Sequence, residues 1–244
     1  MKSVCLVPLL IGLAAAASLP SYIKPCKRGA KLNQCAVVNG NAAIPSFVKG
    51  DAKLKIATLE PVHIKELSIK ENSAKSVALN LTFIDMKIKN LSTGKLVDSN
   101  IDLNKRHIEF TVNVPKVVFD SQYTINGRIL VLPIRGNGPC HIELDTVKLL
   151  YVLDYKMNKV KGVDHAVITN TDLGFEAKKM KVKLDNLFNG DKALGDNMNI
   201  VLNDNWEELL SQLGPPIAKA IALAVKPIVD KIVSQVPFDQ IFPK

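Results

Sequence analysis

The sequence predicts an α+β fold in which a strongly curved antiparallel β-sheet wraps around one long C-terminal helix. Two patterns predict it. Between residues 59 and 187 apolar and polar residues alternate with a period of two, as on strands with one buried and one wet face. Beyond residue 205 apolar residues recur at spacings of three and four, the period of a helix with one buried face. So long an apolar helix needs a long partner surface, and the concave face of the sheet supplies one.

The strands are marked by their alternation and by the turn residues between them. Residues 108–114 (IEFTVNV) alternate regularly, and residues 77–91 form a run that is long for one strand. The apolar phase of this run shifts after Phe83, which predicts a β-bulge near residues 83–85. Turns are expected at residues 92–94, 135–139 and 189–191, and at Asn126-Gly127, which alternatively marks a bulge because the strand pattern continues on both sides.

The C-terminal helix is expected to begin after Asn203, Asp204 and Asn205, any of which is able to cap it. Proline side chains and missing backbone donors predict a break or kink at residues 214–216 and again at Pro227, within a bent helix of up to about thirty residues. The solvent side is expected to hold Lys219, Lys226, Asp230 and Ser234. The apolar stripe comprises Trp206, Leu210, Leu213, Ile217, Ile221, Ala224, Val225, Ile228 and Ile232.

The N-terminus has the pattern of a secretory signal. Residues 1–18 (MKSVCLVPLLIGLAAAAS) join a lysine to an apolar run that ends in small residues and is too short to span a bilayer. We therefore expect a signal peptide over residues 1–18 and a single secreted domain over residues 19–244. An uncleaved anchor is the alternative.

The chain is basic, with 32 Lys and Arg against 23 Asp and Glu. Removal of Lys2 with the signal leaves 31 against 23, a net charge of +8. The lysines are scattered along the expected strands without interleaved aromatic residues, so a nucleic-acid partner is not expected. Weak attraction to an anionic membrane surface stays open.

Three of the four cysteines lie beyond the expected signal. Cys26 and Cys35 enclose a short polar segment that a disulfide could close, and a metal site is disfavoured because no His or Cys pair of zinc-ligand spacing accompanies them. Cys140 is expected to be a buried thiol, the alternatives being an interchain disulfide or a reactive thiol. Sequons begin at Asn80 and Asn90, and we expect glycosylation at Asn90 first.

No catalytic motif is present. The four histidines, His63, His107, His141 and His165, are far apart in the sequence, and no grouping with a carboxylate and a nucleophile is evident. Glu143 and Asp145 are expected on a solvated strand face. The chain is therefore not expected to be an enzyme, to hold a metal or to need a cofactor.

Both ends of the expected mature chain resemble the takeout and juvenile-hormone-binding protein family of insects. The start, LPSYIKPCKRGAKLNQC, contains Cys26 and Cys35, and the tail LNDNWEELLSQLGPPIAKAIALAVKPIVDKIVSQVPFDQIFPK contains Trp206. The stretch RGNGPCHIEL from Arg135 is similar as well, so the resemblance covers essentially the whole mature chain. It implies a secreted haemolymph carrier whose helix and curved sheet enclose an elongated apolar tunnel, with Cys26 and Cys35 joined in a disulfide.

The resemblance also implies the ligand class, a small hydrophobic molecule such as a juvenile-hormone-like terpenoid or another lipid-like compound; a receptor is left unspecified. Tyr123, Thr124, Tyr151 and Tyr155 are strand residues whose hydroxyl groups would orient a ligand if they face inward, ordinary packing being the alternative for each. The residues expected to line the tunnel are Phe83, Phe110, Tyr123, Tyr151, Trp206, Ile217, Ile221, Val225 and Ile228.

Two other functions fit the sequence. The net positive charge also suits a defence protein that binds anionic membranes or lipopolysaccharide, whose binding would depend on salt. A signalling or structural interaction protein would instead have a filled core and a large exposed apolar patch.

Overall fold

The computed structural model describes residues 18–70, 77–129 and 132–244, so the expected signal peptide lies almost entirely outside the described residues. Within these ranges the chain runs through α1 (Leu32–Phe47), β1 (Val62–Lys70), β2 (Val77–Lys89), the 3-10 helix η1 (Leu91–Thr93), β3 (Lys95–Asp102), β4 (His107–Ile129), β5 (Leu132–Val160), β6 (Val163–Leu184), the 3-10 helix η2 (Phe188–Gly190), α2 (Lys192–Asp204), α3 (Trp206–Gln235) and α4 (Phe238–Ile241).

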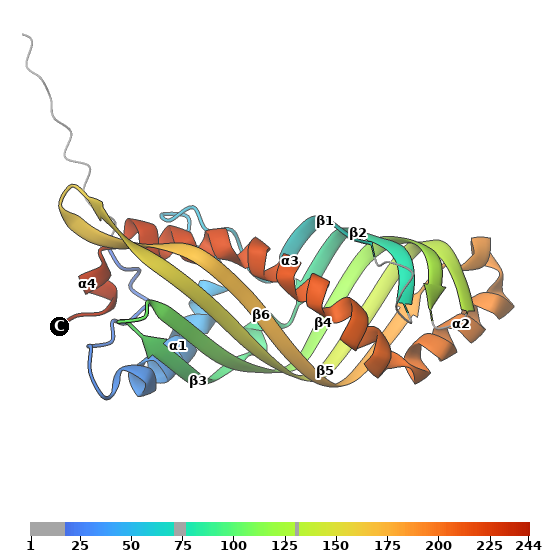
Figure 1. The fold of residues 1–244 in the computed structure, drawn as a ribbon, viewed down its shortest axis with the longest axis horizontal. Helices are drawn as coiled ribbons and strands as arrows, with labels where there is room; N and C mark the ends of the chain where they lie inside the picture. Colours follow the sequence, from blue (N-terminus) through green and yellow to red (C-terminus); the bar gives the residue numbers. More distant parts are fainter. Residues whose placement is uncertain (1–17, 71–76, 130–131) are drawn as a thin grey trace, which may run out of the picture.

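The strands form one antiparallel sheet in the order β1-β2-β4-β5-β6. β2 pairs with residues 118–129 of β4 and β3 pairs with residues 107–113, so β2 and β3 follow each other along one edge of β4. β4, β5 and β6 are 23, 29 and 22 residues long. Strands of this length twist and coil, and the sheet curls into an elongated half-barrel, which confirms the predicted fold class (Figure 1).

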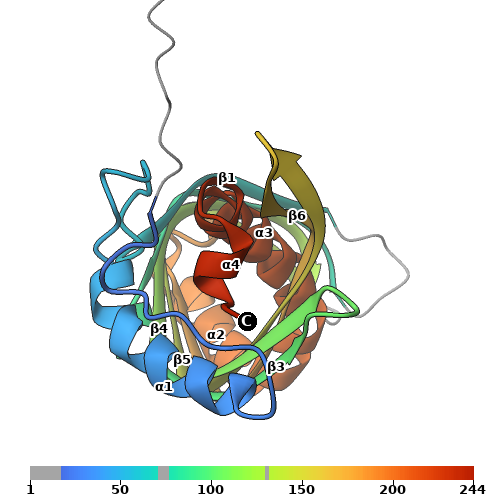
Figure 2. The same cartoon turned by 90° about the vertical axis from the view of Figure 1, so that its left-hand side faces the viewer.

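The helix α3 closes the open side of this half-barrel. It is 30 residues long and packs against β6 and β1, the two edge strands of the sheet (Figures 1 and 2). Gly214, Ala218 and Ala222 are among its buried residues. A Cβ atom at Gly214 would lie 2.9 Å from the ring of Phe175, so the helix approaches β6 more closely than a side chain at this position would allow.

The prolines of α3 do not break it. Pro215, Pro216 and Pro227 all lie inside one uninterrupted helix, so the break allowed for at residues 214–216 does not occur, whereas the predicted length is confirmed. The C-terminal packing that continues through Val236 and Phe238, both buried, holds the helix in place beyond its last proline.

Polar side chains of α2 and α3 cover the free edge of β6. The amide of Asn203 bonds to both the N–H (3.0 Å) and the C=O (2.8 Å) of Val182, and Asn199 does the same for Leu184 at 2.9 and 3.0 Å. Asp230 accepts a bond of 2.8 Å from the N–H of Ile168. Asn203 therefore does not cap α3, and Asp230 does not lie on a solvent face, because the unpaired edge of a strand needs partners.

Two predicted turns lie inside strands. Asn126-Gly127 is part of β4, and its pairing with β2 and β5 continues in register, so it marks neither the predicted turn nor the alternative bulge. Residues 135–139 are part of β5. Gly136 is required by close packing instead: a Cβ atom there would lie 2.8 Å from the hydroxyl of Tyr123 and 2.9 Å from the Cα of Leu187. The turns at residues 92–94 and 189–191 are confirmed, as is the bulge, which shifts the β2 register between Ile84 and Lys87.

Besides the four-residue α4, the helices α1 and α2 have no counterpart in the sequence-based prediction. α1 follows the N-terminal segment and packs against β3. α2 begins at Lys192 and is capped by Asp191, whose carboxylate accepts a bond of 3.0 Å from the N–H of Leu194. α1 lies beside the end of the half-barrel that holds the C-terminus, and α2 lies at the opposite end (Figure 1).

Candidate functional site

The interior between sheet and helices contains two apolar cavities. The larger has a volume of about 400 Å³ and lies at the α1 end of the molecule; we call it the outer cavity. Its walls come from the N-terminal segment, α1, β3, β4, β5, the second half of α3 and the C-terminal segment. The lining residues include Ile23, Lys24, Ala36, Asn39, Gly40, Ala43, Ile44, Phe47, Leu96, Phe110, Val112, Tyr151, Val225, Val229, Ile232, Ile241 and Phe242.

The smaller cavity has a volume of about 90 Å³ and is enclosed by the middle of the sheet, the end of α2 and the first half of α3; we call it the inner cavity. Every side chain in its wall is apolar. The lining residues include Leu81, Phe83, Met86, Phe119, Ile125, Cys140, Leu144, Phe175, Met180, Leu202, Leu209, Leu213 and Ile217.

A packed layer separates the two cavities. On β4 it contains Val114, which lies between residues lining one cavity and residues lining the other, and on β5 it contains Val147. Both valines are at most 2% exposed. On α3 the same position along the axis is taken by Ile221, which packs against this core. We call these three residues the waist, and the interior is two chambers in line with a waist between them.

The outer cavity carries unsatisfied polar groups in or near its wall. The hydroxyls of Tyr151 and of Thr171 on β6 are both buried, and neither forms a hydrogen bond of ordinary geometry among the described residues, although the Thr171 hydroxyl lies close enough to Tyr151 to act on its pKa. Burial raises the pKa of Tyr151, so the group is a neutral donor at physiological pH. Asn39 is occupied, since its amide donates to the carbonyl oxygens of Lys24 and Pro25, both at 3.3 Å. A buried hydroxyl without a well-formed hydrogen bond is costly, and a ligand oxygen would give the Tyr151 hydroxyl a further partner.

The structure divides the predicted lining residues into three groups. Phe83 and Ile217 line the inner cavity, and Phe110, Tyr151 and Val225 line the outer cavity. As ligand contacts these residues stay predictions. The remaining apolar residues pack against the main core without lining either cavity: Trp206, Ile221 and Ile228.

The other predicted hydroxyl groups lie elsewhere. Tyr123 is 2% exposed and donates a bond of 2.8 Å to the carbonyl oxygen of Asp185, which ties β4 to the end of β6. Thr124 is exposed, so its hydroxyl does not face inward. Tyr155 is buried, its hydroxyl has no partner among the described residues, and its ring lies 5.6 Å from that of Phe238.

Sequence reasoning missed the contribution of α1 and of the C-terminal segment. Gly40, Ala43 and Ile44 of α1 line the outer cavity, as do Ile241 and Phe242. The signal in the sequence is small and apolar residues at spacings of three and four between residues 36 and 47. It is weak because residues facing an open cavity need not be large.

The cysteines behave as the sequence suggested. Cys26 and Cys35 form a disulfide that ties the N-terminal segment to α1, with Cα atoms 5.7 Å apart. Cys140 is a buried free thiol in the wall of the inner cavity, and burial raises its pKa to about 12. The sequon residue Asn80 is exposed on β2, whereas Asn90 is half-buried at the end of that strand; glycosylation of either stays a prediction.

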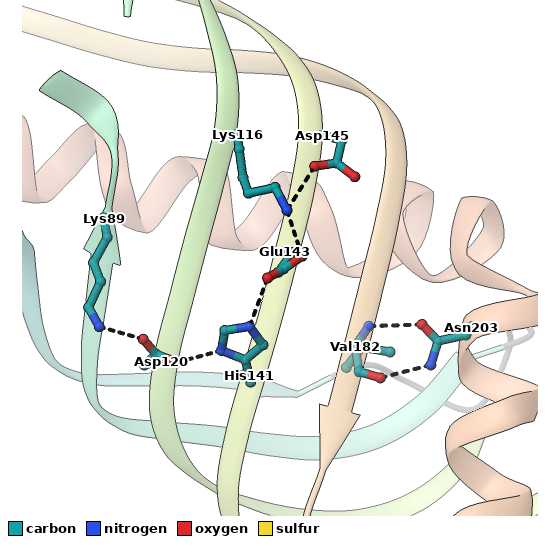
Figure 3. A network of polar contacts seen from close by, with 8 residues as sticks. All are labelled: Lys89, Lys116, Asp120, His141, Glu143, Asp145, Val182 and Asn203. Carbon is teal, nitrogen blue, oxygen red and sulfur yellow. Dashed lines mark hydrogen bonds and ion pairs between the residues drawn. The ribbon is translucent and has the colours of Figure 1, made fainter. Parts of the chain in front are cut away.

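Three of the four histidines, His63, His107 and His141, lie beside carboxylates, which the sequence alone did not show, whereas His165 bonds to the carbonyl oxygen of Val163. His141 lies between Asp120 (2.6 Å) and Glu143 (3.3 Å) in a network across β2, β4 and β5 (Figure 3). Lys116 joins Glu143 at 2.8 Å and Asp145 at 3.3 Å. These residues lie on the outer face of the sheet, so Glu143 and Asp145 are partly solvated as predicted, but they are also ion-paired.

The network shifts the protonation of its members. Hydrogen bonding to Asp120 raises the pKa of His141, and Lys89, 2.7 Å away, together with His141 lowers the pKa of Asp120. A second histidine, His107, has a raised pKa because Glu109 and Asp154 bond to its ring. Within the described ranges no group of three His, Cys, Asp or Glu side chains is arranged so that it could hold a metal ion. No helix in these ranges is long and apolar enough to cross a membrane.

Comparison with known proteins agrees with this architecture. The family model for "Haemolymph juvenile hormone binding protein (JHBP)" matches residues 5–243. The circadian clock-controlled protein daywake of Drosophila melanogaster is 27% identical over 237 residues, which cover 94% of this chain and 90% of that protein. The protein of the same name from Drosophila yakuba is 26% identical over 235 residues, covering 93% and 90%. The crystal structure of Epiphyas postvittana Takeout 1 superposes with a TM-score of 0.83 at 27% identity, over 91% of this chain and 100% of that one.

Proposed function

Because the chain belongs to the haemolymph juvenile hormone binding protein family, we propose that it is a non-catalytic carrier that holds a small hydrophobic molecule in the outer cavity. The observation that carries the proposal is the cavity itself, about 400 Å³ bounded almost entirely by apolar side chains. A cavity of this size and character is typical of sites for lipid-like ligands. The apolar wall fits the ligand class that the family resemblance implies, a terpenoid or another lipid-like compound.

The physical chemistry of such a site is sufficient for useful affinity. Burial of apolar surface contributes about 25 cal/mol per Å², so a ligand that buries roughly 300 Å² gains about 7.5 kcal/mol, which corresponds to micromolar binding. A charged anchor is not needed. The buried hydroxyl of Tyr151, which lies beside that of Thr171, adds orientation, since it favours a ligand with one oxygen atom at the matching place.

We further propose that the protein is secreted. The pattern of residues 1–18 and the Cys26–Cys35 disulfide both support export, because disulfides persist in oxidising compartments. Glycosylation at Asn90 or Asn80 belongs to the same proposal. Expression in insect cells followed by detection in the medium, with mass spectrometry of the mature N-terminus and of both sequons, tests it; retention of the intact residues 1–18 would contradict it.

The carrier function is tested by uptake of a fluorescent apolar probe and by native mass spectrometry of the secreted protein. Ala43→Trp places a large ring in the wall of the outer cavity and is expected to abolish probe uptake. Val38→Trp is the matched control, because Val38 lies on the same helix with 63% of its surface exposed. A wild-type protein that takes up no probe and carries no adduct would refute the proposal, as would equal uptake by the two variants.

A further inference from the structure

The β5–β6 hairpin projects beyond the rest of the sheet. The last residue of β5 that pairs with β4 is Asp154, whereas pairing with β6 continues to Val160. Six residue pairs therefore extend past β4 at the end of the molecule that faces the viewer in Figure 2. The tip turns over Lys161 and Gly162, both with positive φ (50° and 83°), as in the two-residue turns that match strand twist and keep a hairpin rigid.

The hairpin tip combines exposed apolar and basic side chains. Val160 and Val163 pair across the strands and are 44% and 43% exposed. Lys156, Lys159 and Lys161 surround them, and all three are exposed. None of these lysines forms an ion pair within the described part of the chain.

Positive charge is concentrated at this end of the molecule. Four segments meet there around a surface hollow: residues 18–31, 102–107, 154–166 and 237–244. Together they hold ten Lys and Arg against four Asp, a net side-chain charge of +6, out of +8 for the whole of residues 19–244. Three of the four aspartates are already paired, Asp102 with Lys105, Asp239 with Arg28 and Asp154 with His107. We call these four segments the basic end.

The outer cavity reaches the surface beside the basic end. Its wall includes Ile23 and Lys24 of the N-terminal segment and Ile241 and Phe242 near the C-terminus. Lys24 is exposed, so the wall extends from apolar interior to basic surface. A molecule leaving the cavity on this side emerges next to the projecting hairpin.

We propose that the basic end docks onto an anionic lipid bilayer, with Val160 and Val163 entering the interface and the surrounding lysines lying over the headgroups. Lysines near an anionic surface add attraction, and their long apolar stems suit the interface. A protein partner is the weaker match, because protein interfaces are depleted in Lys and enriched in Tyr, Trp and Arg. The use of the contact, exchange of ligand with the membrane, rests on the proposed carrier function; the docking itself does not.

The test is flotation of the mature protein with lipid vesicles. We expect binding to vesicles containing phosphatidylserine, little binding to pure phosphatidylcholine, and weakening as salt is raised. The triple substitution K156Q/K159Q/K161Q is expected to lower the partition coefficient about a hundredfold, since each lysine contributes roughly a fivefold factor. The double variant V160S/V163S is expected to retain the salt-dependent part of the vesicle binding, which comes from the lysines, and to lose the salt-independent part, which comes from the valines.

The matched control removes the same charge elsewhere. Lys178, Lys179 and Lys181 are exposed on β6 away from the basic end, and K178Q/K179Q/K181Q is expected to bind vesicles almost as the wild type does. Equal loss in both triple variants would overturn the proposal, because net charge alone would then explain binding. Absence of wild-type binding would also overturn it and favour an acidic protein surface. Probe uptake measured without vesicles is expected to be unchanged in all variants, which separates this result from failure of the carrier function.

Discussion

Truncation of the waist is expected to lengthen the ligand that the protein accepts. Ile221 occupies the α3 side of the layer between the outer cavity of about 400 Å³ and the inner cavity of about 90 Å³. Ile221→Ala removes three carbon atoms there and is expected to join the chambers. Loss of three methylene-sized groups costs about 2.4 kcal/mol when fully buried. Because Ile221 is partly buried, we expect about 2 kcal/mol, a fall in Tm of roughly 4–8 °C for a chain of this size.

The effect on binding is measured with a series of straight-chain alcohols by calorimetry or probe displacement. Each additional buried methylene contributes about 0.8 kcal/mol, close to a fourfold gain in affinity. In the wild type this gain should stop when the chain fills the outer cavity. In Ile221→Ala it should continue over several further carbons, as the chain enters the inner cavity.

The control is Leu223→Ala, which truncates a residue of the same helix that is 56% exposed. Its affinity profile and its Tm should match those of the wild type. If Ile221→Ala and the wild type stop gaining affinity at the same chain length, the waist does not limit the ligand and the two-chamber interpretation fails.

Two further predictions concern polar contacts. Asn203→Asp leaves the C=O of Val182 without its donor, so we expect the free energy of unfolding, measured by chemical denaturation, to fall by about 1–3 kcal/mol. Asn197→Asp makes the same charge change at an exposed site of α2 and should lower it little. Asp120 raises the pKa of His141 in the folded state, so this contact stabilises most fully below the unfolded pKa of about 6.5 and its contribution is lost as pH rises through the folded value. His141→Gln should therefore lose stability relative to the wild type at pH 5.5 but not at pH 9; equal differences at both pH values would contradict the assignment.

The sheet and the long helix were predictable because many residues follow the period of two of the strands or the spacings of three and four of the helix. The bulge of β2 was also predictable, since a single extra residue moves the apolar phase after Phe83. The turn predicted at residues 135–139 was wrong because glycine occurs both in turns and in strands where another segment approaches closely. Gly136 serves the close approach of Tyr123 and Leu187 and does not form a turn.

The candidate site was predictable only in part. Strand parity and the α3 stripe placed Phe83, Phe110 and Ile217 in cavity walls. Local sequence carries no information on which inward residues meet each other and which face empty space. Ile221 continues the stripe of Ile217, yet it lines neither cavity and packs against the core cluster that contains Val114 and Val147 of the neighbouring strands β4 and β5.

The outer cavity has an energetic consequence that separates it from ordinary packing. Removal of core atoms costs about 24 cal/mol per Å³ of residual cavity, so 400 Å³ corresponds to an upper limit of roughly 10 kcal/mol relative to a filled core. Whole domains are stable by only about 5–15 kcal/mol. Open access to solvent reduces the cost, and the disulfide and long sheet offset part of it. A bound ligand would offset a further part of this cost. At a ligand concentration a hundred times Kd it would add about 2.7 kcal/mol to the free energy of unfolding. Thermal stability should therefore rise with ligand in the wild type and in Val38→Trp, and be insensitive to it in Ala43→Trp, whose added ring already occupies the space.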